Sequence, residues 1–341
     1  MERFAYRRAT SAAAAVHMAR ATPELPGVHA RRSAADSATQ FIAGGTNLTD
    51  YMTLNVLQPS VLVDINRLPQ ESHARIESRT TGLRLGALVR MAEAEEHPVI
   101  RSRYPLIRDT LVLAASRQIR NMASLGGNIL QRTRCEYYRE PSWACNKRLP
   151  GSGCAALEGI NRQHAILGTS EHCIASNPSD QNVALAALEA TVQIVGASGE
   201  RSVSIADFYL LPGDTPQRET VVNPGELVTS VTLPPPAAGA KSTYLKLRDR
   251  ASYEFALASA AVVATVKAGT IERVRIAMGG IGTRPWRSVD AEAALEGKPA
   301  TAQQFASAAE IVLRDAKPQS QNGFKVELAR RCLVHALTMA T

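Results

Sequence analysis

A pair of glycines lies within the stretch Phe41-Ile42-Ala43-Gly44-Gly45-Thr46-Asn47-Leu48. The apolar residues 40–43 predict a strand and residues 48–57 a helix, so the glycines occupy a strand-to-helix turn. Glycine allows backbone N–H groups to approach an anion closely, and the first turn of a helix favours negative charge. The stretch is therefore a candidate binding loop for a diphosphate group, although an ordinary tight turn uses the same residues.

The residues on both sides of this turn predict an α+β fold, because strand-like and helical segments alternate along the chain. Strands are expected at residues 60–65, 83–87, 191–195, 243–247 and 274–278. Helices are expected at residues 12–20, 91–96, 105–115, 183–188, 255–266, 302–313 and 326–337. Prolines at 234–236 mark a turn or linker. We expect an N-terminal domain over residues 1–220 and a smaller C-terminal domain over residues 221–341.

Composition excludes several classes of protein. The chain has 341 residues, a formal net charge of +8 and 45% hydrophobic residues. The basic residues form no long run and no zinc-finger spacing, so we expect no nucleic-acid binding. No apolar run approaches the ~20 residues that span a bilayer, and no signal-peptide core follows the charged N-terminus. We expect a soluble chain with no export signal of its own, whose positive charge suits an acidic partner.

A second glycine turn, Ser124-Leu125-Gly126-Gly127-Asn128, lies further along the chain. Asp180 follows an Asn-Pro-Ser turn and directly precedes an expected helix, where a carboxylate can cap the helix N-terminus or accept hydrogen bonds from a ligand. Two glycine turns with polar followers in one domain favour a nucleotide-like cofactor more than either turn alone.

Together these motifs resemble the FAD-binding subunit of the xanthine dehydrogenase and carbon monoxide dehydrogenase family of molybdenum hydroxylases. The resemblance extends from about residue 4 to residue 335 and includes the stretches 119–128, 179–180, 225–228 and 244–248. It implies a two-lobed FAD-binding domain of the PCMH type, followed by a smaller α+β flavin domain. It also implies that the two glycine turns bind the FAD diphosphate, that Asp180 contacts FAD and that Val228 and Lys246 lie beside the isoalloxazine. The implied FAD-binding residues are Phe41, Ile42, Ala43, Gly44, Gly45, Thr46, Asn47, Leu48, Ser124, Gly126, Gly127, Asn128, Asp180, Val228 and Lys246.

Four of the five cysteines gather in one polar stretch, at Cys135, Cys145, Cys154 and Cys173. The fifth, Cys332, lies in an apolar helical segment and is expected to be a core thiol. The stretch around the four has few apolar residues, so it needs a cross-link to hold its shape. Two disulfides, a zinc ion or an iron–sulfur cluster would each supply one, and the spacing alone does not choose between them.

This stretch, about residues 131–176, separates the Asn128 turn from Asp180 and is therefore an insertion beside the expected FAD site. It closely resembles the corresponding segment of the bacterial periplasmic aldehyde oxidoreductases, a subgroup of the same family. The resemblance implies that the four cysteines bind a [4Fe–4S] cluster. His164 and His172 lie nearby and are expected to be hydrogen-bonding loop residues.

The implied function is electron transfer within a heterotrimeric molybdenum-dependent aldehyde oxidoreductase. A large subunit with a molybdenum cofactor would oxidise the aldehyde, and a small subunit with [2Fe–2S] clusters would pass electrons to FAD and on to an external acceptor. The sequence shows no catalytic triad or other general base for an organic substrate, which fits a subunit whose cofactor supplies the chemistry. Export with a partner to the periplasm is expected, with the cytoplasm as the alternative.

Other readings of the sequence remain. The chain could be the flavin subunit of a related hydroxylase that acts on a purine or another N-heterocycle. It could be a scaffold with a zinc-stabilised loop and no flavin. A flavin oxidase that acts alone is a further alternative, although the missing general base disfavours it.

Overall fold

The computed structural model describes residues 1–20 and 37–341 and contains three β-sheets in those residues. The first sheet is parallel, with the strand order β1-β3-β2. Its strands are β1 (Ala5–Arg8), β2 (Thr39–Ile42) and β3 (Val61–Asp64), and the helices α1 (Ala12–Arg20) and α2 (Leu48–Thr53) accompany it. The glycine turn therefore follows the edge strand β2, as predicted, and opens the short helix α2.

The second sheet is antiparallel and has the order β4-β5-β8-β6-β7. Its strands are β4 (Ile76–Arg79), β5 (Gly82–Gly86), β6 (Thr191–Gly196), β7 (Gly199–Ser204) and β8 (Leu227–Leu233). Strand β8 lies beyond the domain boundary expected at residue 220, yet it is the central strand of this sheet. Its inward-facing residues, such as Val228 and Val231, join the largest hydrophobic core.

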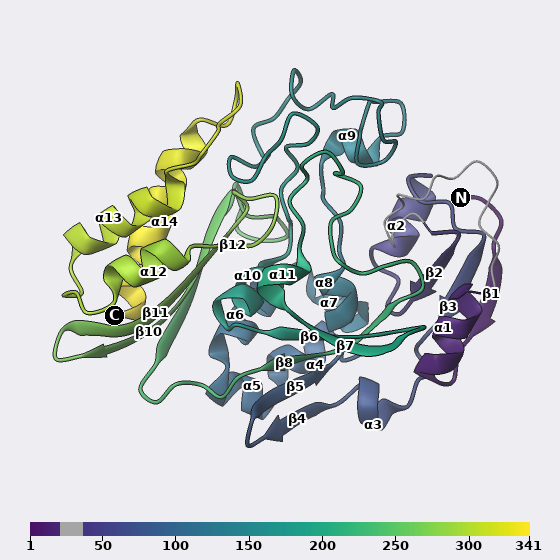
Figure 1. The fold of residues 1–341 in the computed structure, drawn as a ribbon, viewed down its shortest axis with the longest axis horizontal. Helices are drawn as coiled ribbons and strands as arrows, with labels where there is room; N and C mark the ends of the chain where they lie inside the picture. The colour runs from purple at the N-terminus through teal and green to yellow at the C-terminus, as the bar shows by residue number, and fades with distance from the viewer. Residues whose placement is uncertain (21–36) are drawn as a thin grey trace.

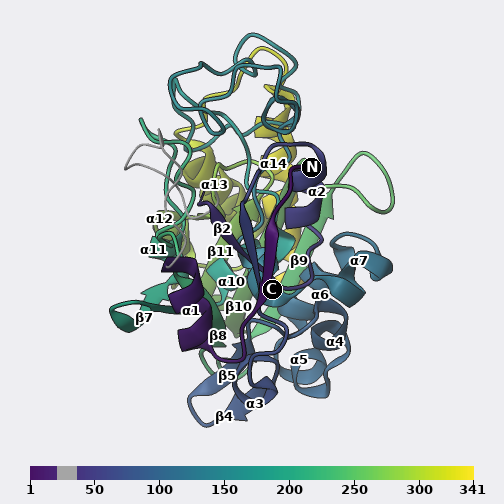
Figure 2. The ribbon, with the colours of Figure 1, turned by 90° about the vertical axis from the view of Figure 1, so that its right-hand side faces the viewer.

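A group of short helices packs on this second sheet and completes that core. Figure 2 shows α4 to α7 gathered on one side of the molecule. The helices between β3 and β8 are α3 (Gln70–His73), α4 (Met91–Glu96), α5 (Pro98–Arg103), α6 (Pro105–Leu113), α7 (Arg117–Met122), α8 (Leu125–Ile129), α9 (Glu136–Arg139), α10 (Asp180–Ala187) and α11 (Ile205–Phe208). Ser116, Ser124 and Ser179 cap α7, α8 and α10 with their side-chain oxygens, so the two cofactor-related turns at 124 and 179 are also helix starts.

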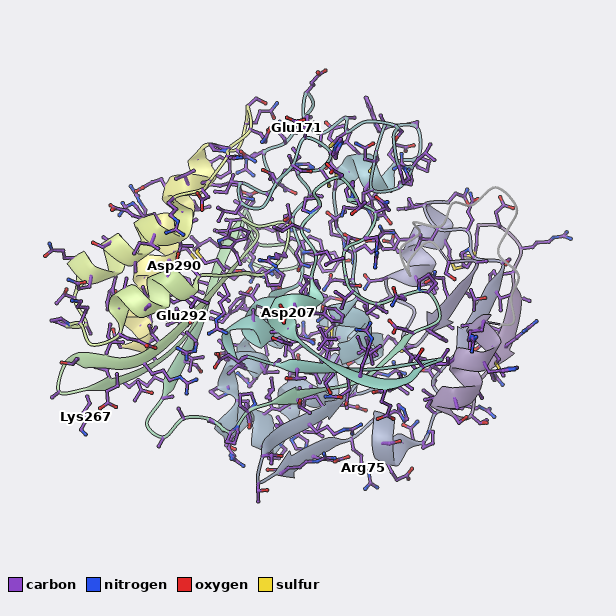
Figure 3. The ribbon with its side chains drawn as sticks, viewed as in Figure 1. Arg75, Glu171, Asp207, Lys267, Asp290 and Glu292 are labelled. Atoms are coloured by element: carbon purple, nitrogen blue, oxygen red, sulfur yellow. The ribbon has the colours of Figure 1, made fainter. Side chains whose placement is uncertain are left out.

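The C-terminal domain is a four-stranded antiparallel sheet, β12-β11-β10-β9, covered on one face by α12, α13 and α14 (Figure 1). The strands are β9 (Lys241–Leu247), β10 (Ala258–Lys267), β11 (Thr270–Gly279) and β12 (Trp286–Arg287). The helices are α12 (Val289–Leu295), α13 (Ala302–Leu313) and α14 (Phe324–Ala340). On α12, which carries Asp290 and Glu292 (Figure 3), the buried Glu292 accepts a hydrogen bond from Ile276 N and forms an ion pair with Arg287.

The prediction of a helix at residues 255–266 is wrong, because most of this segment forms the strand β10. Its alanines suggested a helix, but β10 pairs with β9 on one side and β11 on the other, and it is buried along most of its length. Small alanine side chains such as Ala260 and Ala264 let α14 pack closely on the sheet, and Val262, Val263 and Val266 supply the β-branched residues that strands favour. Tertiary packing thus overrides the helical propensity of alanine.

The cysteine segment contains little regular structure: α9 is the one named element between α8 and α10. Figure 1 shows it as a set of loops at one end of the molecule, and Figure 3 shows Glu171 among these loops. No helix in the described part of the chain has the length and apolar character needed to cross a membrane.

Candidate functional site

A large cavity of about 810 Å³ lies between the first sheet, the helices on the second sheet and strand β9. Every residue that the sequence predicted to bind FAD lines it. These residues are Phe41, Ile42, Ala43, Gly44, Gly45, Thr46, Asn47, Leu48, Ser124, Gly126, Gly127, Asn128, Asp180, Val228 and Lys246. Segments that are up to about two hundred residues apart in the sequence therefore meet around one space, whose size suits a dinucleotide-like cofactor.

The first glycine turn presents unused hydrogen-bond donors to this cavity. Among the described residues, the backbone N–H groups of residues 44–47 donate to no protein acceptor. Gly45 has a φ of +75°, which favours glycine, and a Cβ atom on Gly44 would lie 1.9 Å from the carbonyl oxygen of Met122. Free N–H groups beside a close backbone contact are what an anionic diphosphate requires, so the turn fits the predicted cofactor.

The second glycine turn has a different character, because its N–H groups are used within the protein. Gly126 N donates to Ala87 O at 2.9 Å, and Gly127 N donates to Ser124 Oγ at 3.2 Å. Asn128 reaches from this turn to the start of α10, since Ser179 Oγ donates to Asn128 Oδ1 at 2.9 Å and Asn128 Nδ2 donates to Gln181 Oε1 at 2.9 Å. The second turn therefore shapes the cavity wall and holds the Asp180 turn in place, while the first turn offers the free donors.

Asp180 lines the cavity and belongs to a buried polar network. Lys246 Nζ donates to Asp180 Oδ2 at 2.8 Å and to Leu113 O at 3.0 Å, and the hydroxyl of Tyr244 donates to Asp180 Oδ1. Burial raises the pKa of the Asp180 carboxyl above its ordinary value of 3.8, and the Lys246 ammonium and the Tyr244 hydroxyl counter that effect. Sequence reasoning identified Asp180 and Lys246 but missed Tyr244, because a tyrosine in a strand has the ordinary signature of a core residue.

A cluster of charged residues enters the cavity from the cysteine segment. Arg132 and Lys147 both pair with the half-buried Glu219, whose pKa they hold below its usual range against the effect of burial. Arg134 and Arg139 both pair with Asp50 of α2. Apart from Lys147, these side chains line the cavity. Glu219 had no signal in the sequence.

The four cysteines of the insertion lie near one another and are free thiols. Cys145 and Cys154 form an antiparallel β-bridge, and Cys135 Sγ lies 3.2 Å from His164 Nε2. Burial raises the pKa of Cys135 to about 12, and the neighbouring Cys145 and Cys173 add to this shift. Burial also raises the pKa of Cys173, although the Lys147 ammonium opposes it. A bound metal ion would therefore favour loss of the proton from Cys135 and Cys173.

In the described residues, no group of three or more His, Cys, Asp or Glu side chains is arranged to hold a metal ion. The metal ligands Cys135, Cys145, Cys154 and Cys173 accordingly stay a prediction. The segment is ordered by polar contacts as well: Asn146 Oδ1 accepts from Gly151 N and Gly153 N at 3.1 and 2.9 Å, and Arg148 donates to Tyr137 O and Tyr138 O at 2.8 and 2.6 Å.

A smaller cavity of about 170 Å³ is lined both by residues of the cysteine segment and by residues of the large cavity. Cys135 and His164 line it, and so do Arg134, Asp180 and Phe255, which also line the large cavity. The Nδ1 atom of His164 is buried and has no hydrogen-bond partner among the described residues. At least one of the four cysteines therefore lies directly beside the candidate cofactor site.

Two family models match nearly the whole chain. The FAD binding domain in molybdopterin dehydrogenase matches residues 2–236, and the CO dehydrogenase flavoprotein C-terminal domain matches residues 242–340. The division between them falls after β8, in agreement with the pairing of that strand in the second sheet.

Individual members of this family are also similar to the chain. The aldehyde oxidoreductase FAD-binding subunit PaoB of Escherichia coli (strain K12) is 43% identical over 343 residues, which covers 100% of this chain and 99% of that protein. The glyceraldehyde dehydrogenase medium chain of Sulfolobus acidocaldarius is 30% identical over 76% of this chain and 74% of its own length. A solved structure of carbon monoxide dehydrogenase from Hydrogenophaga pseudoflava has the same fold, with a TM-score of 0.75, 24% identity and coverage of 99% of this chain and 97% of that one.

Proposed function

Because this chain belongs to the family of FAD-binding subunits of molybdenum hydroxylases, we propose that it is the electron-transfer subunit of a molybdenum-dependent aldehyde oxidoreductase. The observation that carries the proposal is the 43% identity, over the full length of both chains, to an aldehyde oxidoreductase FAD-binding subunit. Relatives that are named for nicotinate or nicotine are 26% and 25% identical. The aldehyde assignment is therefore favoured over the N-heterocycle alternative.

FAD supplies redox chemistry in one- or two-electron steps when it is bound, and the residues of this chain bind it and adjust its surroundings. The free N–H groups of residues 44–47 would hold the diphosphate. The network of Asp180, Tyr244 and Lys246 gives the cavity a fixed set of charges and donors. Buried hydrogen-bonded groups of this kind orient a cofactor firmly, because they cannot relax into solvent.

We propose further that Cys135, Cys145, Cys154 and Cys173 bind a [4Fe–4S] cluster. Three observations support this. The thiols lie in one segment, where Cys145 and Cys154 face each other in a β-bridge. No disulfide joins them in the described residues. The buried cations Arg132 and Lys147 lie in the same segment, where they would offset the negative charge of a thiolate-bound cluster. A zinc ion on the same thiols is the alternative.

The partners follow from the same reasoning. A large subunit with a molybdenum cofactor would oxidise the aldehyde, and a small subunit with [2Fe–2S] clusters would deliver the electrons to this chain. An external acceptor would then take them from the FAD. We place the complex in the periplasm as a proposal, with export through a partner subunit.

An anaerobic visible absorption spectrum with iron and zinc analysis tests these proposals on the full chain. We expect flavin bands, a broad shoulder near 400 nm and about four irons per chain. Cys154→Ser should lose the shoulder and the iron, whereas Cys332→Ser, a buried thiol of α14 far from the segment in sequence, should keep both. Zinc in place of iron would refute the cluster and retain the FAD assignment. A colourless protein, with FAD absent after gentle purification, would refute electron transfer.

The substrate class has to be tested on the assembled complex. Co-expression with large and small subunits of this family should give a complex that reduces an artificial acceptor with aromatic or aliphatic aldehydes. Turnover of purines or nicotinate with no turnover of aldehydes would favour the N-heterocycle alternative.

A further inference from the structure

Two arginines share one carboxylate at the wall of the FAD cavity. Arg139 donates to both oxygens of Asp50, from Nη1 at 2.6 Å and from Nη2 at 3.1 Å. Arg134 Nη1 lies 3.3 Å from Asp50 Oδ2. The hydrogen bond from Arg139 lowers the pKa of Asp50, with a further contribution from the charge of Arg134. One carboxylate with two guanidinium groups leaves a surplus of one positive charge at this place.

The surplus belongs to Arg134, because Arg139 already makes the two-point contact with Asp50. The other amino group of Arg134 donates to Asn47 Oδ1, a neutral acceptor in the first glycine turn. Its Nε is buried and has no hydrogen-bond partner among the described residues. Arg134 therefore has an incompletely balanced charge, and it touches the turn that presents free N–H groups.

The other cations of the cavity wall have their own partners. Arg132 pairs with Glu219, Lys246 with Asp180 and Arg250 with Glu254. Arg139 pairs with Asp50. Arg132 shares Glu219 with Lys147, so a surplus charge is present there too. Among the described cations of the cavity wall, however, Arg134 is the one that contacts the first glycine turn, where an anionic ligand is expected.

The guanidinium group of Arg134 is also held in a fixed place. Its central carbon lies 5.7 Å from the ring centre of Tyr51 and 5.4 Å from the ring centre of Phe255. Aromatic faces on both domains attract the cation and restrict its side chain. A restrained arginine loses less freedom when it binds a phosphate, so its contacts are more effective than those of a mobile one.

From these contacts we propose that Arg134, a residue of the cysteine segment, is a further FAD-binding residue that pairs with the diphosphate beside Asn47. The cysteine segment then forms part of the FAD site itself. The proposal depends on FAD binding and does not depend on which metal the cysteines hold. It assigns Asp50 the opposite role, because its negative charge lies beside the diphosphate and weakens the attraction to the two arginines.

The test measures the Kd of FAD for the full chain after removal of its flavin, by fluorescence quenching at several salt concentrations. A charge-assisted hydrogen bond contributes about 1.5–3 kcal/mol, so Arg134→Gln should weaken FAD binding roughly ten- to hundredfold. Arg134→Lys should restore part of the loss, because it keeps the charge without the planar fork. Asp50→Asn should tighten binding severalfold.

Salt dependence separates a direct contact from a merely structural role. The increase of Kd with salt should be less steep in Arg134→Gln than in the natural chain, because one charged contact with the diphosphate is gone. The control is Arg148→Gln, which removes one charge from the same segment but lines neither cavity. It should leave the salt dependence unchanged.

Three results would overturn the proposal. One is a Kd for Arg134→Gln within threefold of that of the natural chain. Another is weaker binding in Asp50→Asn, which would mean that the ion pair merely holds the turn. The third is an unchanged salt dependence in Arg134→Gln. Should that variant fail to fold, Arg134→Lys and Asp50→Asn still give opposite signs under the proposal, namely weaker and tighter binding.

Discussion

Lys246 and Asp180 form a buried ion pair that joins the two domains of the chain, with Lys246 Nζ 2.8 Å from Asp180 Oδ2 and only 1% and 5% of the two side chains exposed. Asp180 opens α10 in the N-terminal domain, and Lys246 lies on β9 of the C-terminal sheet. Neither charge has access to water that could replace its partner. The pair therefore links the stability of the domain arrangement to the site that both residues line.

Removal of one member of this pair should be more harmful than removal of both. Lys246→Met leaves a buried carboxylate without its cation and should lower the free energy of unfolding by about 3–5 kcal/mol. The double variant Asp180→Asn, Lys246→Met should lose less than the sum of the two single variants. Urea unfolding of the four proteins, with FAD removed, measures this coupling. Strictly additive losses would show that the two charges do not stabilise each other.

A methyl group on Gly44 should disturb the packing of the two glycine turns. Its Cβ would lie 1.9 Å from the carbonyl oxygen of Met122, and this backbone atom cannot move aside as a flexible side chain would. We expect Gly44→Ala to lower the free energy of unfolding by about 1–3 kcal/mol and to lower the flavin content of the purified chain. Gly323→Ala is the control, because nothing lies within 4 Å of its Cβ position and its φ of −56° suits alanine. Equal behaviour of the two variants would contradict the close approach.

The hydroxyl of Tyr51 should connect α2 to the cysteine segment. It lies 3.1 Å from Arg132 O and 3.0 Å from Thr133 O, and it is buried. Tyr51→Phe leaves these buried carbonyl groups without that donor, so we expect a loss of about 1–3 kcal/mol in the free energy of unfolding. FAD should also bind more weakly, because Arg134 and the first glycine turn meet beside this residue. Unfolding and flavin titration measure the two effects, and a variant that changes neither would exclude the connection.

Lys325 should give the chain a specific dependence on pH. The buried ammonium donates to three backbone carbonyls, those of Gln163, His164 and Gly280, at 3.1, 2.9 and 2.6 Å. Burial nevertheless lowers the pKa of Lys325 from 10.5 to about 7. Between these two values the unfolded chain binds the proton more fully than the folded chain does. The free energy of unfolding should therefore rise with pH in this window, by up to about 1.4 kcal/mol per pH unit.

Lys325→Met tests this dependence, because the variant lacks the group that titrates. The difference between the unfolding free energies of the natural chain and the variant should change between pH 7 and pH 10, in the direction that favours the natural chain at high pH. Urea unfolding at pH 7, 8, 9 and 10 gives the difference directly. A constant difference over this range would mean that the folded chain keeps the proton on Lys325 and that its three carbonyl contacts outweigh burial.

The residues predicted to bind FAD lie in short polar motifs that can be read from the sequence, and their contact with FAD stays a prediction. The residues around Gly44, Gly126 and Asp180 are local turn signals, and the fold brings all three to one cavity. Helices with strong apolar periodicity, such as α13 (Ala302–Leu313), were predicted to the residue. The helix after the first glycine turn was predicted too long, since it ends at Thr53 before Asn55, which has a φ of +55°.

The parts that the sequence did not predict depend on distant partners. The segment of β10 has the composition of a helix, and its neighbours β9 and β11 determine that it is a strand. Glu219 and Tyr244 have no local signal, because each acquires its role from residues about sixty or more positions away, Arg132 and Asp180 respectively. Interactions that arise only in three dimensions cannot be identified from the spacing of one chain.

The continuity of residues 132–135 has a practical consequence for the purified protein. Arg132 and Arg134 contact the cavity region through Glu219 and Asn47, and the next residue in the chain is Cys135. A change of backbone position at Cys135 would therefore displace both arginines at once. Loss of whatever group Cys135 binds would then also loosen the flavin, so a preparation that loses its yellow colour should be checked for its metal content before the flavin site itself is blamed.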